Sequence, residues 1–359
     1  MTMSRAFSPP RPRKAEFPYS ILFIPAGSAK LASTRTQAFE RVAELRSRNI
    51  RADILDPQRK PTWRGNKLRA LLLPFRSPGY DILFFQKTLH PRYRAAMRAA
   101  RQRGQLVAFH TDDWFADAAA ALNDCFASAD ISFVCSAFLA AKARAAKGNP
   151  VLLPAVVDPT RFRPAPHGQK GPLVLGWVGA SLYENLLLIK APLARLAQRR
   201  RILLRIVGAP PEPILAELRA ARIPIGITGF LPKEEVPSVV SSFDIALMPA
   251  PDNALHRAAM PTKLLEYMAA GLPCVASKVG EIPHILKGTG LIAHASKDWD
   301  RHLEQLAKSP ALRSRLGRAA RTRILARYSL QATTDLLLEA LAHALKEPTT
   351  TAAAKAQRP

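Results

Sequence analysis

Short apolar segments alternate with amphipathic helical segments along most of the chain, which is typical of parallel sheets covered by helices. In the first half of the chain, strands are expected at 21–25, 51–56, 80–86, 105–110, 131–136 and 151–156. After a break the alternation starts again, and strands are expected at 172–179, 202–208, 225–230, 244–250 and 273–277. The sequence therefore predicts an α/β protein with two doubly wound, Rossmann-like domains.

The break between the two series is a segment with four prolines and little apolar periodicity, AVVDPTRFRPAPHGQKGP. We therefore predict an N-terminal domain at 18–154, a linker at 155–172 and a C-terminal domain at 173–330. A terminal helix at 331–346 follows and can pack back on the N-terminal domain. The predicted disordered ends are a basic leader, 1–17, and a tail, 347–359.

Composition excludes several other classes of protein. Apolar residues make up 48% of the 359 residues, too many for a fully disordered chain, and three cysteines are too few for a disulfide scaffold. No uncharged apolar run approaches the roughly 18 residues that a membrane span requires. Since no secretory signal is recognisable, we expect a cytoplasmic protein.

The net charge of +26 is concentrated in one part of the chain. Residues 41–105 contain 16 Lys and Arg side chains against four Asp and Glu side chains. No zinc finger, RNA-recognition signature or aromatic–basic interleaving accompanies them, so nucleic-acid binding is not expected. We predict a basic N-terminal face, including Arg94, Arg98, Arg101 and Arg103, that docks on an anionic membrane or meets an acidic acceptor.

Two sequence patterns that resemble known sites lie in the wrong context, and the residues for a third kind of site are too scattered. The segment 288–293, GTGLIA, precedes a strand instead of following one, which argues against a dinucleotide fingerprint. Asp298-Trp299-Asp300 opens a helix, where acidic residues favour the positive end of the helix dipole. Cysteine and histidine are too scattered for a zinc site, and no metal site is predicted.

The segment 260–280, MPTKLLEYMAAGLPCVASKVG, contains the most informative spacing in the chain. Lys263 and Glu266 are three residues apart and therefore share one face near the start of a helix. A helix N-terminus with an added lysine suits a diphosphate, and a carboxylate one turn further along suits ribose hydroxyls. An i, i+3 surface ion pair is the alternative.

The order of residues in this segment resembles the donor-binding segment of the retaining group 1 glycosyltransferases, which have the GT-B fold. The likeness extends to GWVGAS, to GFLPKEEVPSVVSSFDIALMPA and to LRSRLGRAARTRILARYS. It covers roughly 20–345, and it is specific in 173–327 and generic in the first domain. It implies two Rossmann-like domains facing each other across a cleft.

The resemblance also implies an activity, the transfer of a sugar with retention from a nucleotide sugar to a glycan or lipid-linked acceptor. It implies a role in cell-envelope polysaccharide or glycolipid synthesis, on the inner face of the plasma membrane. The nucleoside-diphosphate sugar is a co-substrate, and neither a metal nor another cofactor is expected. The alternatives are another nucleotide-sugar enzyme (an epimerase or hydrolase) and a degenerate scaffold that binds without catalysis.

By position in the family pattern, Glu266 binds the ribose and Lys263 the diphosphate. The remaining donor-binding positions are the diphosphate loop Gly179, Ala180 and Ser181, the nucleobase segment Phe230, Leu231 and Pro232, and the first-domain loop Gly27 and Ser28. Residues near the reacting sugar, and therefore the candidate catalytic residues, are His110, Asp112 and Asp113.

The chain departs from the family pattern at two places. Ala258 stands where the family has its first glutamate, which contacts the donor sugar, and Asp252 or Asn253 are candidates to replace it. The loop 179–186 lacks the usual Arg and Lys, so Lys263 is the expected diphosphate cation.

Four further residues of the first domain are candidates for a role in the site, and for three of them a structural interpretation competes. Thr111 or Asp112 can cap a helix instead of serving the reaction. Arg35 can hold an acceptor phosphate or remain solvated. Lys87, which follows a strand, can face the cleft.

Overall fold

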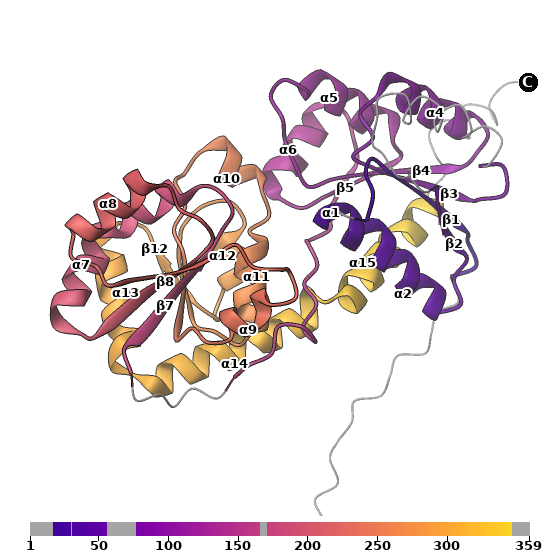
Figure 1. The fold of residues 1–359 in the computed structure, drawn as a ribbon. Helices are drawn as coiled ribbons and strands as arrows, with labels where there is room; N and C mark the ends of the chain where they lie inside the picture. Colours follow the sequence, from indigo (N-terminus) through magenta and orange to yellow (C-terminus); the bar gives the residue numbers. More distant parts are fainter. Residues whose placement is uncertain (1–16, 30, 56–76, 166–170, 347–359) are drawn as a thin grey trace, which may run out of the picture.

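The computed structural model describes residues 17–29, 31–55, 77–165 and 171–346, which form two lobes side by side (Figure 1). Each lobe is built on a six-stranded parallel sheet. The predicted leader (apart from Phe17) and the predicted tail lie outside the described residues.

The first sheet has the strand order β2-β1-β3-β4-β5-β6. Its strands are β1 (Ile21–Pro25), β2 (Ala52–Ile54), β3 (Ile82–Gln86), β4 (Leu106–Thr111), β5 (Ile131–Val134) and β6 (Pro150–Leu152). Four of them are buried along their whole length, β1, β3, β4 and β5. The strand order reverses between β1 and β3, and parallel sheets bind ligands outside the carboxyl ends of the strands at such a switch point.

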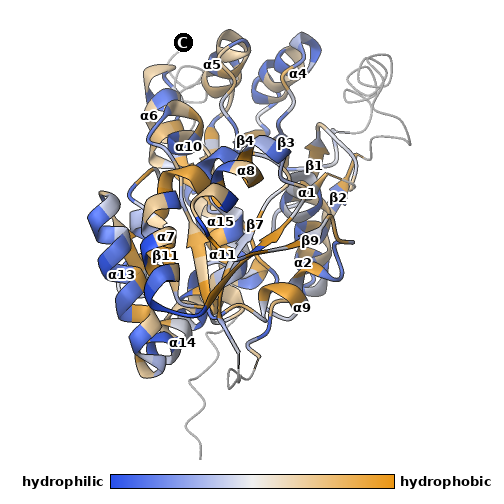
Figure 2. Ribbon diagram, turned by 60° about the vertical axis from the view of Figure 1, so that its left-hand side comes forward, coloured by the Kyte–Doolittle hydropathy of each residue, from blue (hydrophilic) through white to orange (hydrophobic). Residues whose placement is uncertain are grey.

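Helices cover both faces of this sheet. One face packs against α2 (Arg41–Ser47), which continues from α1 (Ala32–Thr34) and from a π-helical turn, η1 (Arg35–Glu40). The other face packs against α4 (Pro91–Gln102), α5 (Ala119–Ser128) and α6 (Ala137–Ala145). Figure 2 shows the apolar residues concentrated along the strands and the inward faces of these helices.

The second sheet has the order β12-β11-β10-β7-β8-β9, with the switch point between β7 and β10. Its strands are β7 (Leu173–Val178), β8 (Ile202–Val207), β9 (Ile225–Gly229), β10 (Ile245–Met248), β11 (Cys274–Ser277) and β12 (Leu291–Ala293). The segments that surround it are η2 (Tyr183–Ile189, a 3₁₀ helix), α7 (Lys190–Arg199), α8 (Glu212–Ala220), α9 (Val236–Val240), α10 (Ala254–Ala258), α11 (Thr262–Ala269), α12 (Ile282–Leu286), α13 (Ser296–Lys308) and α14 (Pro310–Arg327).

Asp298 acts at the start of α13 as a helix cap. Its carboxylate accepts hydrogen bonds from the main-chain N–H groups of His294 (3.0 Å) and Ala295 (3.2 Å). The helix-opening interpretation of the Asp-Trp-Asp pattern is therefore confirmed.

The chain crosses between the lobes twice, once after β6 and once between α14 and α15 (Leu330–Lys346). The two crossings touch, because the main-chain N–H of Val157 donates to Tyr328 O (3.0 Å). Beyond its crossing, α15 packs on α2, and its Leu337 and Leu341 complete the apolar core beneath β1.

A fully buried arginine joins α15 to the first lobe. The Arg41 guanidinium donates to Gln37 Oε1 (2.8 Å) and to Thr334 Oγ1 (3.1 Å). Burial lowers the pKa of Arg41 to about 10, so it stays charged at neutral pH. These hydrogen bonds fix α15 against the helix that follows the first loop of the sheet.

Candidate active site

The carboxyl edges of the two sheets face each other. Ser136, directly after β5, donates through Oγ to Ala258 O at the end of α10 (2.8 Å). The Ala137 main-chain N–H donates to Glu281 Oε1, next to α12 (2.6 Å). Because the loops at the two switch points leave these same edges, the ligand-binding positions of both sheets open toward one space between the lobes.

A tightly held loop follows β7 at the second switch point. The Gly179 N–H donates to Val207 O (2.9 Å), and the Gly179 carbonyl accepts from Tyr183 Oη (2.8 Å). The same Tyr183 oxygen accepts from the Ala209 N–H (2.9 Å). Leu182 has a φ of +61°, which costs a non-glycine residue about 1–2 kcal/mol. Such strain persists only where surrounding contacts hold the backbone in place, as the hydrogen bonds of Gly179 and Tyr183 do next to the loop 179–181.

Gly208, directly after β8, supports this loop from below. Its φ is +139°, and a Cβ there would lie 2.0 Å from Gly179 O. Glycine is therefore required at this position for the backbone to approach the loop so closely.

Lys263 and Glu266 lie on the first turns of α11, beside this loop. No side chain caps the start of α11. Burial raises the pKa of Glu266 to about 7, although the charges of Lys263, Arg161 and Lys233 oppose the rise. Burial also lowers the pKa of Lys263. Among the ion pairs of the described residues none joins Lys263 to Glu266, so the surface ion-pair alternative is wrong.

The predicted nucleobase segment lies open at the end of β9. The Phe230 side chain is 67% exposed, and Pro232 is exposed as well, whereas Leu231 is partly buried. Arg161, from the linker, donates to Lys233 O (2.9 Å). The pKa of Lys233 is lowered by burial and by the positive charges of Arg35 and Arg161, so cations from both lobes and the linker influence this end of the site.

The first-lobe residues gather at the carboxyl ends of β3 and β4. Lys87 Nζ forms ion pairs with Asp112 and with Asp113 (2.5 Å). Burial lowers the pKa of Lys87, but the two carboxylates outweigh this effect and raise it. The pKa of Asp112 is lowered, because His110 and Lys87 outweigh the effect of burial. Lys87 has a φ of +55°, in the left-handed region that residues with a Cβ rarely adopt.

His110 lies beneath the cluster and is fully buried. Within the described residues neither ring nitrogen has a hydrogen-bond partner. Burial lowers its pKa to about 4, so the imidazole is neutral at physiological pH. Buried polar atoms are nearly always hydrogen-bonded in native proteins, and these two nitrogens are therefore available to a ligand or a water molecule.

The structure corrects the helix-cap interpretation of Thr111 and Asp112. Thr111 Oγ1 donates to Asp113 O (3.0 Å) in a local turn, and the next described helix begins only at Ala119. Gly27 is buried next to Leu31, and Ser28 is partly buried in the same loop after β1, at the first switch point.

The residues considered as replacements for the missing family glutamate are engaged within their own segment. Asp252 pairs with Arg257 (2.6 Å), and Asn253 caps α10 by accepting from the His256 N–H (3.0 Å). Ala258 is buried, and its carbonyl holds Ser136. Arg35 pairs with Glu40 (3.3 Å).

Ion pairs compensate about half of the charge of the predicted basic face of α4. Arg94 pairs with Asp124 (2.5 Å), as does Arg98 (3.2 Å), and Arg101 pairs with Asp130 (2.8 Å). Within the described residues no helix has both the length and the apolar character needed to cross a bilayer. Nor does the described part of the chain contain three or more His, Cys, Asp or Glu side chains grouped as for a metal ion.

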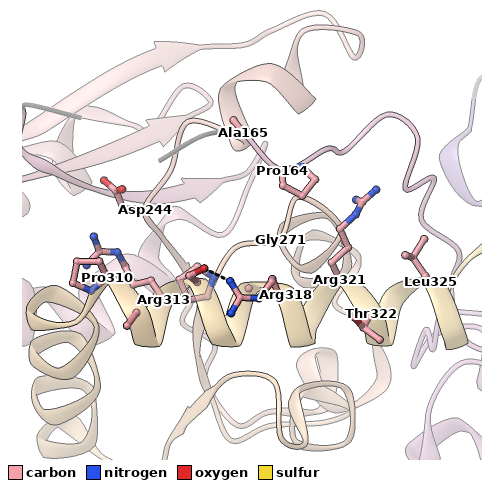
Figure 3. A pocket seen from close by; sticks show the side chains of 14 residues that line it. Pro164, Ala165, Asp244, Gly271, Pro310, Arg313, Arg318, Arg321, Thr322 and Leu325 are labelled. Atoms are coloured by element: carbon pink, nitrogen blue, oxygen red, sulfur yellow. Dashed lines mark hydrogen bonds between the residues drawn. The ribbon is translucent and has the colours of Figure 1, made fainter. Parts of the chain in front are cut away.

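Two of the cavities among the described residues differ in position. The larger, of about 720 Å³, follows α14 from Pro310 to Leu325 (Figure 3). It reaches Asp244 and Pro273, which precede β10 and β11, so it lies at the amino edge of the sheet, away from the site. The smaller, of about 320 Å³, lies between the lobes, and its lining includes Ala137, Arg257, Lys278, Glu281 and His284.

Residues 172–309 match the family model described as "Glycosyl transferases group 1". Over these residues the chain is therefore similar to the group 1 glycosyltransferases. The chain is 30% identical over 154 residues to a D-inositol 3-phosphate glycosyltransferase of Saccharomonospora viridis, which covers 39% of this chain and 34% of that one. It is 30% identical over 197 residues to a 2-deoxystreptamine glucosyltransferase of Streptomyces kanamyceticus, covering 47% and 49%. The chain thus matches between a third and a half of the length of these relatives.

Solved structures extend the likeness from these residues to the fold of the whole chain. HepE of Anabaena in complex with UDP and glucose has a TM-score of 0.66 at 14% identity, covering 90% of this chain and 100% of that one. Sucrose-phosphate synthase of Thermosynechococcus elongatus has a TM-score of 0.69 at 15% identity, covering 90% and 98%. The lipopolysaccharide outer core galactosyltransferase WaaB has a TM-score of 0.65 at 16% identity, covering 90% and 99%. The chain therefore has the GT-B fold.

Several residues of the site were not predicted. Tyr183 and Gly208 hold the loop after β7 but carry no recognisable motif, and Arg161 and Lys233 come near Glu266 only through the fold. A non-glycine residue at positive φ, such as Leu182, has no signature in a single sequence.

Proposed function

We propose that the chain is a retaining glycosyltransferase that moves a sugar from a nucleoside-diphosphate sugar to a glycan or lipid-linked acceptor. The observation that carries the proposal is the arrangement of Lys263 and Glu266 on α11, beside the loop 179–181 at the second switch point. The likeness to HepE, which was solved with UDP, supports uridine diphosphate as the donor nucleotide.

In the proposed complex, the diphosphate lies against the loop 179–181 and the Lys263 ammonium. Glu266 accepts hydrogen bonds from the ribose hydroxyls, and the base packs on the exposed Phe230 segment. Negative charge grows on the leaving diphosphate as the anomeric carbon becomes oxocarbenium-like. A prepositioned cation and main-chain N–H groups stabilise such charge because they need no reorganisation during the reaction.

The first lobe faces the sugar in this proposal. His110, neutral at physiological pH, hydrogen-bonds to the sugar, and Gly27 and Ser28 close on the donor–acceptor junction. Asp112 and Asp113, oriented by Lys87, hold the attacking hydroxyl. The acceptor reaches them through the cavity between the lobes, beside Ala137 and Glu281.

The cellular setting is also a proposal: cell-envelope polysaccharide or glycolipid synthesis, in the cytoplasm at the inner face of the plasma membrane. The net charge of +12 on residues 41–105 supports contact with an anionic surface. Because ion pairs engage Arg94, Arg98 and Arg101, that contact relies on other basic residues of the lobe.

Calorimetric titration with UDP tests the donor site. Glu266→Gln replaces the carboxylate that is proposed to accept hydrogen bonds from the ribose hydroxyls. We expect UDP affinity to fall by about tenfold or more, since hydrogen bonds to charged groups contribute about 1.5–3 kcal/mol. Glu212→Gln, on the exposed start of α8, is the matched control and should bind UDP normally. Equal affinities of both variants would refute the assignment of Glu266.

The alternative of a non-catalytic scaffold is favoured by one observation, the replacement of the family glutamate by Ala258. Release of UDP from a UDP-sugar, measured with and without a glycan acceptor, separates the two. Acceptor-dependent release supports transfer, and binding without any release supports the scaffold.

A further inference from the structure

The loop 179–181 contains neither Lys nor Arg, and Lys263, the cation proposed for the diphosphate, lies over an aromatic ring. Lys263 Nζ lies 5.4 Å from the centroid of the Trp177 ring. A cation at this distance over an aromatic face is attracted to the ring, and more strongly where water is excluded. Trp177 is 3% exposed and Lys263 is partly buried, so the contact between them is largely shielded from water.

The same ring also packs beneath the loop. A Cβ added to Gly179 would lie 2.1 Å from Trp177 Cη2, so the indole occupies the space where a side chain of the loop would be. Tyr183 packs against Trp177 with ring centroids 5.2 Å apart and donates through its hydroxyl to Gly179 O. Trp177 therefore contacts the loop, the tyrosine that holds it and the lysine beside it.

An aromatic partner differs from a carboxylate in one respect that matters for binding. A carboxylate in contact with the ammonium would neutralise it and compete with an incoming phosphate, whereas the indole face orients the ammonium without adding a negative charge. Ordering a lysine side chain on binding costs conformational entropy, and a lysine that is already ordered avoids most of this cost.

We propose that Trp177 is a positioning residue for the diphosphate, because its ring holds the Lys263 ammonium beside Gly179 before the nucleotide binds. This inference rests on the proposed donor site. It also explains how the loop functions without the Arg and Lys that the family places after it.

A double-mutant cycle on the full chain, with UDP as the titrated ligand, tests the proposal. Trp177→Leu should weaken UDP binding by about tenfold in the parent chain, the fold-change that corresponds to 1.4 kcal/mol. In the Lys263→Met background the same substitution should cause less than a twofold loss, because the ammonium that the ring orients is absent. Affinity for uridine, which has no phosphate, should be unchanged by Trp177→Leu.

Two further variants separate orientation of the lysine from support of the fold. Trp177→Phe keeps an aromatic face and should recover most of the UDP affinity. If Trp177→Leu does not fold, the double-mutant cycle uses Trp177→Phe instead. The expected loss of UDP affinity in the parent chain is then two- to threefold. Trp299→Leu replaces another tryptophan of the same core, 5% exposed and on α13. It should lower stability without changing UDP affinity.

Equal losses in the parent and Lys263→Met backgrounds would overturn the proposal, since Trp177 would then support the loop alone. An equal loss of uridine affinity would do the same. If the parent chain binds neither UDP nor any other nucleoside diphosphate, the proposed function itself fails.

Discussion

Gly208→Ala perturbs the loop 179–181 from a position outside the proposed donor-binding residues. The added methyl group would lie 2.0 Å from Gly179 O and 2.6 Å from Tyr183 Oη. Cβ contacts shorter than 3.0 Å essentially do not occur, so the Gly179 carbonyl has to move by about 1 Å. A displacement of about 1 Å in a positioning group can cost about 100-fold in rate, and we expect a loss of that order in turnover. UDP affinity should fall as well.

Stability should decrease in the same variant for two separable reasons. The φ of +139° is strained for any residue with a Cβ, at a cost of about 1–3 kcal/mol. Overpacking against the loop adds about 1–3 kcal/mol. Urea unfolding followed by fluorescence measures the total, and UDP titration measures the effect on the loop.

Two other glycines of the chain provide matched controls. Gly104 also has a positive φ, +83°, but an added Cβ would meet nothing within 4 Å, so Gly104→Ala isolates the backbone cost. Gly226→Ala introduces neither strain nor a clash, because its nearest neighbour would be 3.5 Å away. If Gly208→Ala matches Gly104→Ala in both stability and UDP affinity, the argument from the close contact is refuted.

Four further predictions concern titration, charge and thiol reactivity. Because the pKa of Glu266 is about 7 in the free chain and ribose binding favours the carboxylate, UDP affinity should rise between pH 5 and 7, and Glu266→Gln should lose this part of the pH dependence in calorimetry. By the same shift, Glu266 contributes stability below its ordinary pKa of 4.5, and this contribution disappears as the pH rises through about 7. Lys87→Met leaves Asp112 and Asp113 unpaired, so turnover should fall by about tenfold or more while UDP affinity is retained; equal loss of both would contradict its place in the first lobe. Burial raises the pKa values of all three thiols, so a thiol reagent should modify the native chain slowly and the unfolded chain at three positions, Cys125, Cys135 and Cys274.

Local patterns in the sequence predict most of the two sheets, because buried parallel strands appear in the sequence as short runs of apolar residues. They do not predict α5, whose preceding residue Ala118 provides no capping side chain, or the one-turn-long α10. They also place Lys263 and Glu266 together, since three residues along a helix bring two side chains onto one face.

Contacts between distant segments account for what the sequence does not predict. Lys87 and Asp113 are 26 residues apart, and Ser136 and Ala258 are 122 apart, so neither pair has a local pattern. The stacking of Lys263 on Trp177 depends on how α11 lies against β7. Ion pairing on α4 likewise depends on acidic residues of other elements, such as Asp124, which charge counting along one helix does not reveal.

The return of α15 to the first lobe has a consequence for biosynthesis. The first lobe is encoded mainly before residue 154, but the face of its sheet beneath β1 is completed by Leu337 and Leu341, and Arg41 finds its hydroxyl partner in Thr334. During translation this face emerges from the ribosome long before the helix that covers it. The nascent first lobe must therefore wait for nearly the whole chain, with its apolar surface accessible to chaperones, and the second lobe is free to fold before the first is finished.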